Sequence, residues 1–264
     1  MFDKTICPKC EKAYDDHRDK CPKCHALNDS FSRNKKINMM FWPHPIMQVV
    51  YFLIGFLLIQ IIPIFVRLGL ADLASKNPVY YSALLNCITY LTITIVFALV
   101  LIPEYFQLGR QFQKGFRTYL IAIIGFLVLI SFSFLWSYIY SLAFPNQIND
   151  NQNSINTMTI SYPILSLLSV VFFAPFVEEL TYRVGLFGFL HRINRYLAYS
   201  VTIIFFALIH INFQTTNWGA EAMAIPTYLA GATILTIAYE KGGFASSYLI
   251  HLANNLLSFI LIFL

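Results

Sequence analysis

The stretch that decides the fold is SYPILSLLSVVFFAPFVEELTYRVGLF, residues 161–187. Its first part, residues 161–177, carries no charged side chain, and the adjacent Glu178 and Glu179 then precede Arg183. A run of about 20 apolar residues crosses the hydrocarbon core of a bilayer as a helix. Because a charge is costly there, charged residues in such a run are expected to pair, to line a cavity or to do chemistry.

The composition extends this interpretation to most of the chain. Of the 264 residues, 58% are hydrophobic and 12% are charged, whereas soluble globular proteins carry about 25% charged residues. Nine of the 18 Lys and Arg residues lie within residues 1–45. The first long apolar run begins only at Ile46, which is too late for a cleavable secretory leader. The sequence therefore predicts an all-α polytopic membrane protein in the lipid bilayer, with a short polar head and no nucleic-acid partner.

Seven apolar runs predict about seven transmembrane helices. They cover residues 46–67, 79–102, 118–144, 160–182, 197–213, 222–239 and 244–264. If the head is inside, the inner segments, with Arg183 counted in one of them, hold 16 Lys and Arg residues, and the outer loops hold two. Such a bias places the N-terminus in the cytoplasm of a multi-pass cell-membrane protein.

The head contains CPKCEKAYDDHRDKCPKC, residues 7–24, in which two CxxC pairs are formed by Cys7, Cys10, Cys21 and Cys24. Two such pairs can close a tetrahedral zinc site, whose binding energy folds a segment too small for its own core. Redox motifs rarely come as a matched double, and disulfides need an oxidising compartment. Residues 1–28 are therefore expected to form a structural zinc ribbon, with residues 29–45 as a linker and residues 46–264 as the transmembrane domain.

Helical spacing separates the roles of the two glutamates. Glu179 and Arg183 are at i and i+4, in the favourable order for an ion pair. Glu178 has Tyr182 at that spacing and is expected to face a cavity, where a carboxylate can take and return protons. The alternative places both carboxylates in headgroup water at a helix end.

Two later apolar runs also carry polar side chains. His210 lies in SVTIIFFALIHINF, and His251 is followed by Asn254 and Asn255, both of which can share its helical face. Each has a structural alternative, because a lone histidine is usually a packing residue and asparagines join helices in lipid. Together with the glutamates they are the parts of a hydrolytic site, namely a base, a second proton carrier and oxyanion donors. The GxSG, GxGD and HExxH patterns are missing from the sequence, so hydrolysis would use Glu and His.

Three motifs in order now resemble a known family. EELTYR matches EExxxR, FALIH matches FxxxH and HLANN matches HxxxN of the CAAX protease and bacteriocin-processing (Abi) family of intramembrane proteases. The resemblance covers residues 160–264. It implies Glu178 as the base that activates water, His210 as a holder of that water, and His251 and Asn255 as oxyanion donors. Glu179 and Arg183 would form the supporting pair. The family has been interpreted both as metal-free and as metal-dependent, and we favour metal-free catalysis.

The resulting hypothesis is an intramembrane endopeptidase that hydrolyses a membrane-associated peptide or protein. Because Arg183 lies near the inner end of the fourth run, the site is expected to open to the cytoplasmic half. The zinc-ribbon head resembles bacterial ones and would bind a cytoplasmic protein partner. The alternatives are a non-catalytic scaffold or bacteriocin-immunity protein, and a small transporter.

Overall fold

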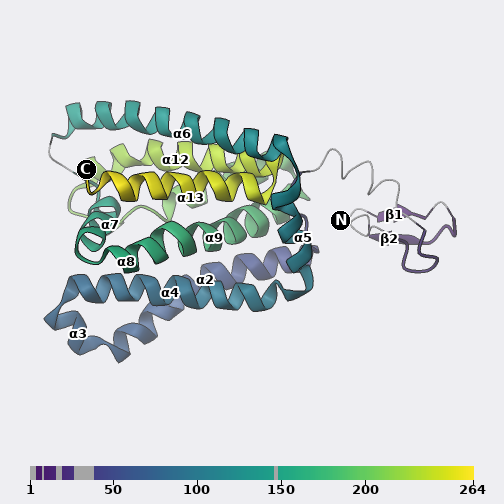
Figure 1. Ribbon diagram of the computed structural model, residues 1–264, viewed down its shortest axis with the longest axis horizontal. Helices are drawn as coiled ribbons and strands as arrows, with labels where there is room; N and C mark the ends of the chain where they lie inside the picture. The colour runs from purple at the N-terminus through teal and green to yellow at the C-terminus, as the bar shows by residue number, and fades with distance from the viewer. Residues whose placement is uncertain (1–3, 8, 16–19, 27–38, 146–147) are drawn as a thin grey trace.

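The computed structural model describes residues 4–7, 9–15, 20–26, 39–145 and 148–264, and it is predominantly helical (Figure 1). The head contains two short antiparallel strands, β1 (Lys4–Ile6) and β2 (Ala13–Asp15). The longest single helices are α2 (Pro45–Gly69), α4 (Pro78–Val100), α6 (Phe116–Ala143), α12 (Trp218–Gly242) and α13 (Phe244–Leu261). Shorter elements are α3 (Ala71–Lys76), η1 (Ile102–Glu104), α5 (Tyr105–Gly109), η2 (Arg110–Gln113), α7 (Asp150–Ser161) and α11 (Arg195–Leu208).

One further helix is composite and contains the stretch quoted first. It runs without a break over Pro163–His191 and changes its winding along the way. Its parts are α8 (Pro163–Ser166), the π-helix η3 (Leu167–Phe173), α9 (Ala174–Glu178), the π-helix η4 (Glu179–Phe187) and α10 (Gly188–His191). Since this helix continues past Arg183, that arginine lies inside the span. The expectation that Arg183 begins an inner loop was therefore wrong.

The polytopic all-α fold is confirmed, with one change to the fifth run. In the described part of the chain, six helices are long and apolar enough to cross a membrane, the composite helix included. The run expected at 197–213 instead gives α11, which ends at Leu208. Residues 209–217, which connect α11 to α12, are not helical.

The early end of α11 has a local cause at His210. In a continuing α-helix the backbone N–H of His210 would bind the carbonyl of Phe206. Here the His210 ring nitrogen Nδ1 takes that carbonyl, at 2.8 Å, and the backbone N–H binds Ala207 O at 3.2 Å instead. The side chain thus competes with the helix for its acceptor, and the fifth run is shorter than its hydropathy indicates.

Asparagine and proline mark the helix starts. The side-chain oxygen of the N-cap residue accepts a backbone N–H at the start of α4 (Asn77), α7 (Asn149), α11 (Asn194) and α12 (Asn217). Pro45 and Pro78 occupy the first turns of α2 and α4, where no backbone donor is lost. These residues set where each span begins.

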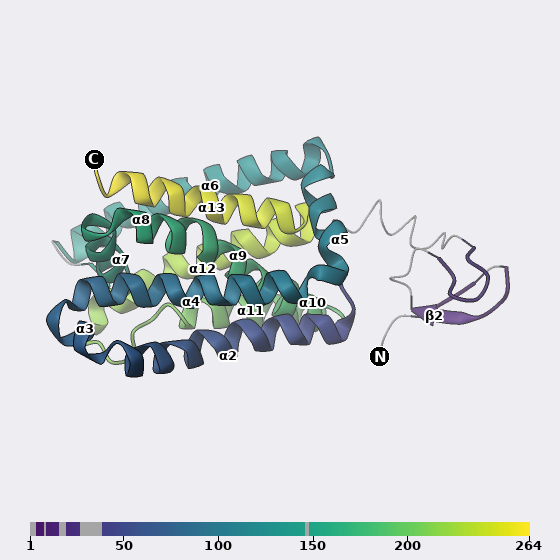
Figure 2. The ribbon, with the colours of Figure 1, turned by 60° about the horizontal axis from the view of Figure 1, so that its bottom comes forward.

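The bundle has its composite helix in the middle. In Figure 1, α2 and α4 lie on one side of it and α6, α12 and α13 lie on the other. Figure 2 again shows α6 and α13 on the side away from α2 and α4. α2 packs on η4, α4 packs on η3 and α9, and α13 packs on η3 and η4. We call the two ends of the bundle the α5 end, with residues 105–109, and the α7 end, with residues 150–161. This layering buries residues 174–188 between two sets of helices.

Two glycines permit close approach within this arrangement. A Cβ on Gly185 would lie 2.7 Å from the backbone nitrogen of Phe52, so only glycine lets α2 reach η4. Gly243 has a φ of 86°, which allows the sharp turn from α12 to α13 at the α5 end. A Cβ there would also collide with the carbonyl of Met39. Residues 39–41 are buried against this turn, whereas most of the predicted linker, residues 29–38, lies outside the described residues.

Candidate active site

The two glutamates lie at a change of helix winding. Glu178 is the last residue of α9, and Glu179 is the first of the π-helix η4. A π-helix bonds i to i+5 instead of i+4, and such turns are frequent at functional sites. Residues 177–185 are all buried, and the exposed fractions of Glu178 and Glu179 are 6% and 0%. Headgroup water at a helix end does not surround these carboxylates.

Glu179 is held by two partners. Its Oε1 lies 3.1 Å from Arg183 NH1, and both side chains are fully buried. The same oxygen lies 2.9 Å from Nδ1 of His251 on α13. The Arg183 guanidinium also lies over the ring of Phe206, at 4.2 Å from its centroid. The predicted ion pair is therefore present, and it extends to a histidine 72 residues further along the chain.

Glu178 presents its two oxygens differently. Oε1 accepts a hydrogen bond from the Tyr90 hydroxyl of α4, at 3.0 Å. Oε2 makes no hydrogen bond with any described residue, and it lies 3.8 Å from Nε2 of His251. One imidazole thus stands between both carboxylates, with Nδ1 toward Glu179 and Nε2 toward Glu178. A gap of this size suits a bridging water.

A cavity of about 770 Å³ opens beside this group. It is lined by Glu178, His210, His251 and Asn255, together with residues of α4, α6, α7 and α12. Since the carbonyl of Phe206 only accepts, Nδ1 of His210 must donate to it. In the neutral ring, Nε2 is then the free acceptor. The structure brings the four side chains of the three motifs to one cavity, although they span 78 residues of sequence.

Asn255 is engaged in helix packing as well. Its amide donates to the carbonyl of Val170 in η3, at 2.9 Å. This bond uses one of two amide hydrogens. The Asn254 amide in turn lies 3.4 Å from Asn255 Oδ1. Asn255 thus joins α13 to the composite helix, as the structural alternative expected, and still lines the cavity.

A second group of polar contacts, at the α7 end, is not evident from the sequence. Glu221 is 1% exposed, and its carboxylate accepts the backbone N–H of Asp150 at 2.7 Å and that of Asn212 at 3.4 Å. The Asn212 amide donates to Asp150 Oδ2 at 2.7 Å. A buried glutamate at the start of α12 therefore ties α7 to the segment that follows α11.

Tyr228 connects this end to His210. Its ring stacks on the imidazole, with centroids 5.0 Å apart and an interplanar angle of 26°. Its hydroxyl accepts from the amides of Asn149 and Asn151, at 3.3 and 3.1 Å. The position of His210, outside α11, is therefore set by α7 and α12.

The cavity extends toward the α7 end and not toward the α5 end. Its lining includes residues 151–159 of α7, and His210 also borders a smaller hollow of about 260 Å³ with Asp150 and Asn212. Glu178 itself lies near the middle of the Pro163–His191 helix. We expected the site to open on the same side as the predicted inner loops. That expectation is wrong, because Arg183 is buried within the composite helix and does not lie in a loop.

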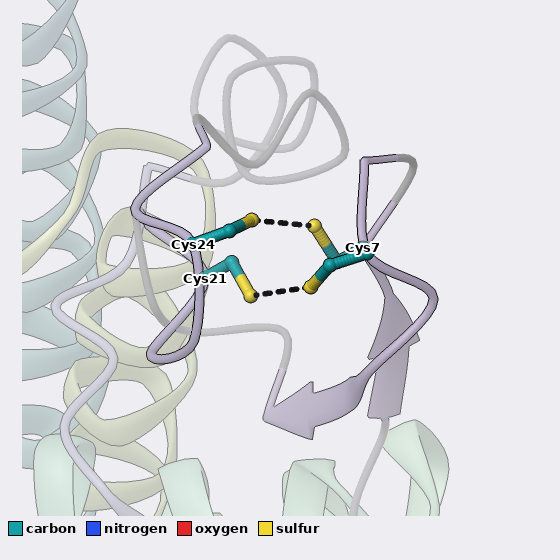
Figure 3. Close-up of side chains that lie close together, drawn as sticks. Cys7, Cys21 and Cys24 are labelled. Carbon is teal, nitrogen blue, oxygen red and sulfur yellow. Dashed lines mark hydrogen bonds between the residues drawn. The ribbon is translucent and has the colours of Figure 1, made fainter.

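The four head cysteines form the predicted cluster. All four sulfur atoms lie within 4.8 Å of one another, and they are the metal-compatible group found among the described residues. Cys7 Sγ is 3.4 Å from Cys24 Sγ, and Cys10 Sγ is 3.5 Å from Cys21 Sγ. Figure 3 shows the sulfurs of the two turns pointing toward one another. Sulfurs around a tetrahedral zinc lie about 3.8 Å apart, so these residues fit a metal ion.

The two turns have the same internal geometry. Cys7 O accepts the N–H of Glu11, and Cys21 O accepts the N–H of His25, each at 2.9 Å. Glu11 and His25 each have a φ of 55°. Burial raises the pKa of the Cys21 thiol, but the backbone N–H groups of Lys23 and Cys24 and the neighbouring thiols outweigh it and lower the pKa to about 6. The backbone of His25 closes the second turn, and the metal-compatible group consists of the four cysteines without this histidine.

Comparison with known proteins finds a family similarity in the segment that carries the site. Residues 160–257 match the family model described as Type II CAAX prenyl endopeptidase Rce1-like. The UPF0177 protein YvdC of Lactococcus lactis subsp. lactis (strain IL1403) is 29% identical over 140 residues, 53% of this chain and 51% of the relative. The chain thus spans about half the length of the curated relative it matches, and no solved structure is significantly similar to it. The segment that carries Glu178, His210, His251 and Asn255 is therefore similar to Rce1-like Type II CAAX prenyl endopeptidases.

Proposed function

We propose that the chain is an endopeptidase that hydrolyses a peptide bond of a membrane-associated peptide or protein inside the bilayer. The observation that carries the proposal is the arrangement around Glu178. A buried carboxylate faces a cavity with one oxygen free of hydrogen bonds to the described residues, and His251 Nε2 lies 3.8 Å from that oxygen. A general base needs this kind of access to a water molecule.

The chemical step follows from these positions. Glu178 Oε2 takes a proton from water, and the water oxygen bonds to the carbonyl carbon of the scissile peptide. His210 holds the water through Nε2. The second amide hydrogen of Asn255, and His251 when its Nε2 carries a proton, stabilise the oxyanion. When the carbonyl re-forms, the C–N bond breaks and the proton on Glu178 passes to the leaving nitrogen.

Glu179 and Arg183 support this step without contacting the substrate. A buried carboxylate without its cation would be an uncompensated charge. The pair gives His251 Nδ1 a fixed acceptor, which orients Nε2 toward Glu178. We therefore assign Glu179 and Arg183 to positioning and not to contact with the substrate.

We favour water activation without a catalytic metal. Glu178, His210 and His251 are the residues that a metal-dependent mechanism would use. Within the described ranges, however, their ligand atoms do not form a cluster of the kind that the four cysteines form. We therefore propose zinc only for the head.

The location of the chain is part of the proposal. The excess of Lys and Arg in the head and at the α5 end favours a cytoplasmic N-terminus in a bacterial cell membrane. The cavity then opens toward the non-cytoplasmic half, and the head is free to bind a cytoplasmic partner. Trypsin added to inverted vesicles should remove the Lys-rich head, whereas right-side-out vesicles should protect it. Protection in inverted vesicles would reverse the assigned orientation.

The decisive experiment compares the wild type with Glu178→Gln in detergent, against a library of short peptides, with mass spectrometry of the products. We expect cleavage by the wild type and a fall of about 10²–10⁴-fold in the variant, with an unchanged melting temperature. Equal cleavage by both proteins would remove Glu178 from the mechanism. If neither folded protein cleaves any peptide, a scaffold or immunity protein would be favoured. The hydrogen bond between Asn255 and Val170, which joins two helices, is the contact that supports this alternative.

A further inference from the structure

Tyr90 lies outside the segment that matches the family model, and its side chain contacts Glu178, the proposed base. It lies on α4, and its hydroxyl donates to Glu178 Oε1 at 3.0 Å. The family match begins only at residue 160, and Tyr90 sits in an apolar run without any motif. It also lines the cavity beside Glu178. The contact joins residues 88 positions apart, so only the packing of α4 on α9 creates it.

The register of α4 against the composite helix is set by a separate contact. Asn86, one turn before Tyr90, places its amide 3.5 Å from the hydroxyl of Ser169 in η3. The Ser169 hydroxyl donates to Leu165 O at 2.7 Å, so it is itself fixed to its own helix. Since Asn86 and Tyr90 are four residues apart, they share one face of α4. The hydroxyl of Tyr90 is therefore presented to Glu178 by a defined helix pairing.

The hydrogen bond makes the two oxygens of Glu178 unequal. With Oε1 held by Tyr90, the carboxylate plane is fixed, and Oε2 is directed to the cavity and to His251. A hydrogen bond to an ionised carboxylate also stabilises the charged form, which is the form that accepts a proton. Both effects serve a base that must work away from bulk water.

We propose that Tyr90 is a positioning residue for the reaction, which orients the Glu178 carboxylate and keeps it ready to take a proton from water. This inference rests on the proposed function and adds a residue of α4 to the site. The alternative is a packing tyrosine whose buried hydroxyl only needs an acceptor. The two differ in catalysis, because a packing role leaves turnover and its pH dependence unchanged.

The test is Tyr90→Phe, which keeps the ring and removes the donor. We expect kcat to fall by about 10- to 100-fold, as for loss of a hydrogen bond to a charged group, while KM changes less than about two-fold. The acidic limb of the kcat/KM profile should move to higher pH, because a donor to the ionised base is lost. Tyr81→Phe, on the same helix and away from the cavity, is the matched control and should behave as the wild type.

The pH readout is specific to Glu178 only if its other neighbours stay in place. The ionisable groups around it are Glu179, Tyr182 and Arg183 of η4, His210, His251 of α13 and Tyr90 itself. Tyr90→Phe changes one of them, and an unaltered melting temperature would show that the rest of the site remains packed.

A second measurement tests the contact without relying on activity. Tyrosines labelled with ¹³C at Cζ give 16 signals, one per tyrosine, and the signal that disappears in Tyr90→Phe is that of Tyr90. It should move in Glu178→Gln and stay in place in Glu104→Gln, a change in η1 just beyond the C-terminal end of α4. An unmoved signal, or full activity of Tyr90→Phe, would overturn the inference while leaving an active protease. A wild type that cleaves no peptide would instead overturn the proposed function, and the role of Tyr90 with it.

Discussion

Two ion pairs in this protein have the same spacing and the same order, with the acid first and the base four residues later. In α3, Asp72 and Lys76 are 2.8 Å apart, and their side chains are 78% and 72% exposed. In η4, Glu179 and Arg183 are 3.1 Å apart and fully buried. Helical spacing brings each pair together, but burial decides its energy, because water screens the first pair and the second has lost its water. Among the described residues, the buried pair has a further partner in His251.

The largest effect expected is that of Arg183→Met. The change leaves Glu179 buried without its cation, which costs about 3–5 kcal/mol. We expect a large drop in thermal stability, loss of folded protein in mild detergent, and no cleavage. Size-exclusion chromatography and melting curves would measure it.

A double variant checks the cause. Glu179→Gln combined with Arg183→Met removes both charges, so much of the lost stability should return even though activity does not. If the double variant is as unstable as Arg183→Met, the packing of the guanidinium on Phe206, and not the charge, holds the site together.

The head provides a comparison of another kind, because its four thiols are gathered by local turns. Cys7→Ser combined with Cys10→Ser should reduce bound zinc to zero and unfold the head, since its buried cluster among the described residues consists of the four cysteines with Tyr14 and Ala26. The bundle should keep its melting temperature, and cleavage by the purified protein should stay within about two-fold. Metal analysis, melting curves and the peptide assay measure the three effects. Loss of intrinsic activity with an intact bundle would give the head a role in catalysis.

An intermediate effect is expected at the α7 end. Glu221→Gln replaces one carboxylate acceptor by an amide donor, against the backbone N–H groups of Asp150 and Asn212. We expect a loss of about 1–3 kcal/mol, with reduced turnover because the segment carrying His210 is released. Thr157→Ala, an exposed change on α7, is the control. Unchanged turnover in Glu221→Gln would separate this network from the site.

The smallest effect belongs to the exposed pair. Lys76→Ala should change stability by less than about 0.5 kcal/mol, since exposed i,i+4 pairs are worth little. Melting curves at low and high salt would show it, and the difference should vanish in high salt. A loss comparable to that of Arg183→Met would mean that spacing and not burial governs both pairs.

Prediction from the sequence succeeded for features that depend on a single property of a residue type, such as hydrophobicity or metal ligation. The apolar runs gave the membrane helices, and the paired CxxC turns gave the metal-compatible cluster, which is confirmed. The roles of Glu178, His210, His251 and Asn255 stay predictions, although the structure places all four at one cavity. The prediction of a fifth membrane helix over residues 197–213 was wrong. Hydropathy does not take into account that the His210 side chain competes with the backbone for a helix carbonyl.

What the sequence by itself determined is the class of molecule, namely a polytopic helical protein with a cysteine head and three polar motifs in its last hundred residues. Hydrophobic length and local ligand spacing are properties of short segments, so they can be read without the fold. Only the tertiary structure decided which oxygen of Glu178 is free, that His251 stands between both glutamates, and that Tyr90 and Glu221 belong near the site. Those contacts join residues that are tens of positions apart, and they exist only because bilayer helices pack in one register.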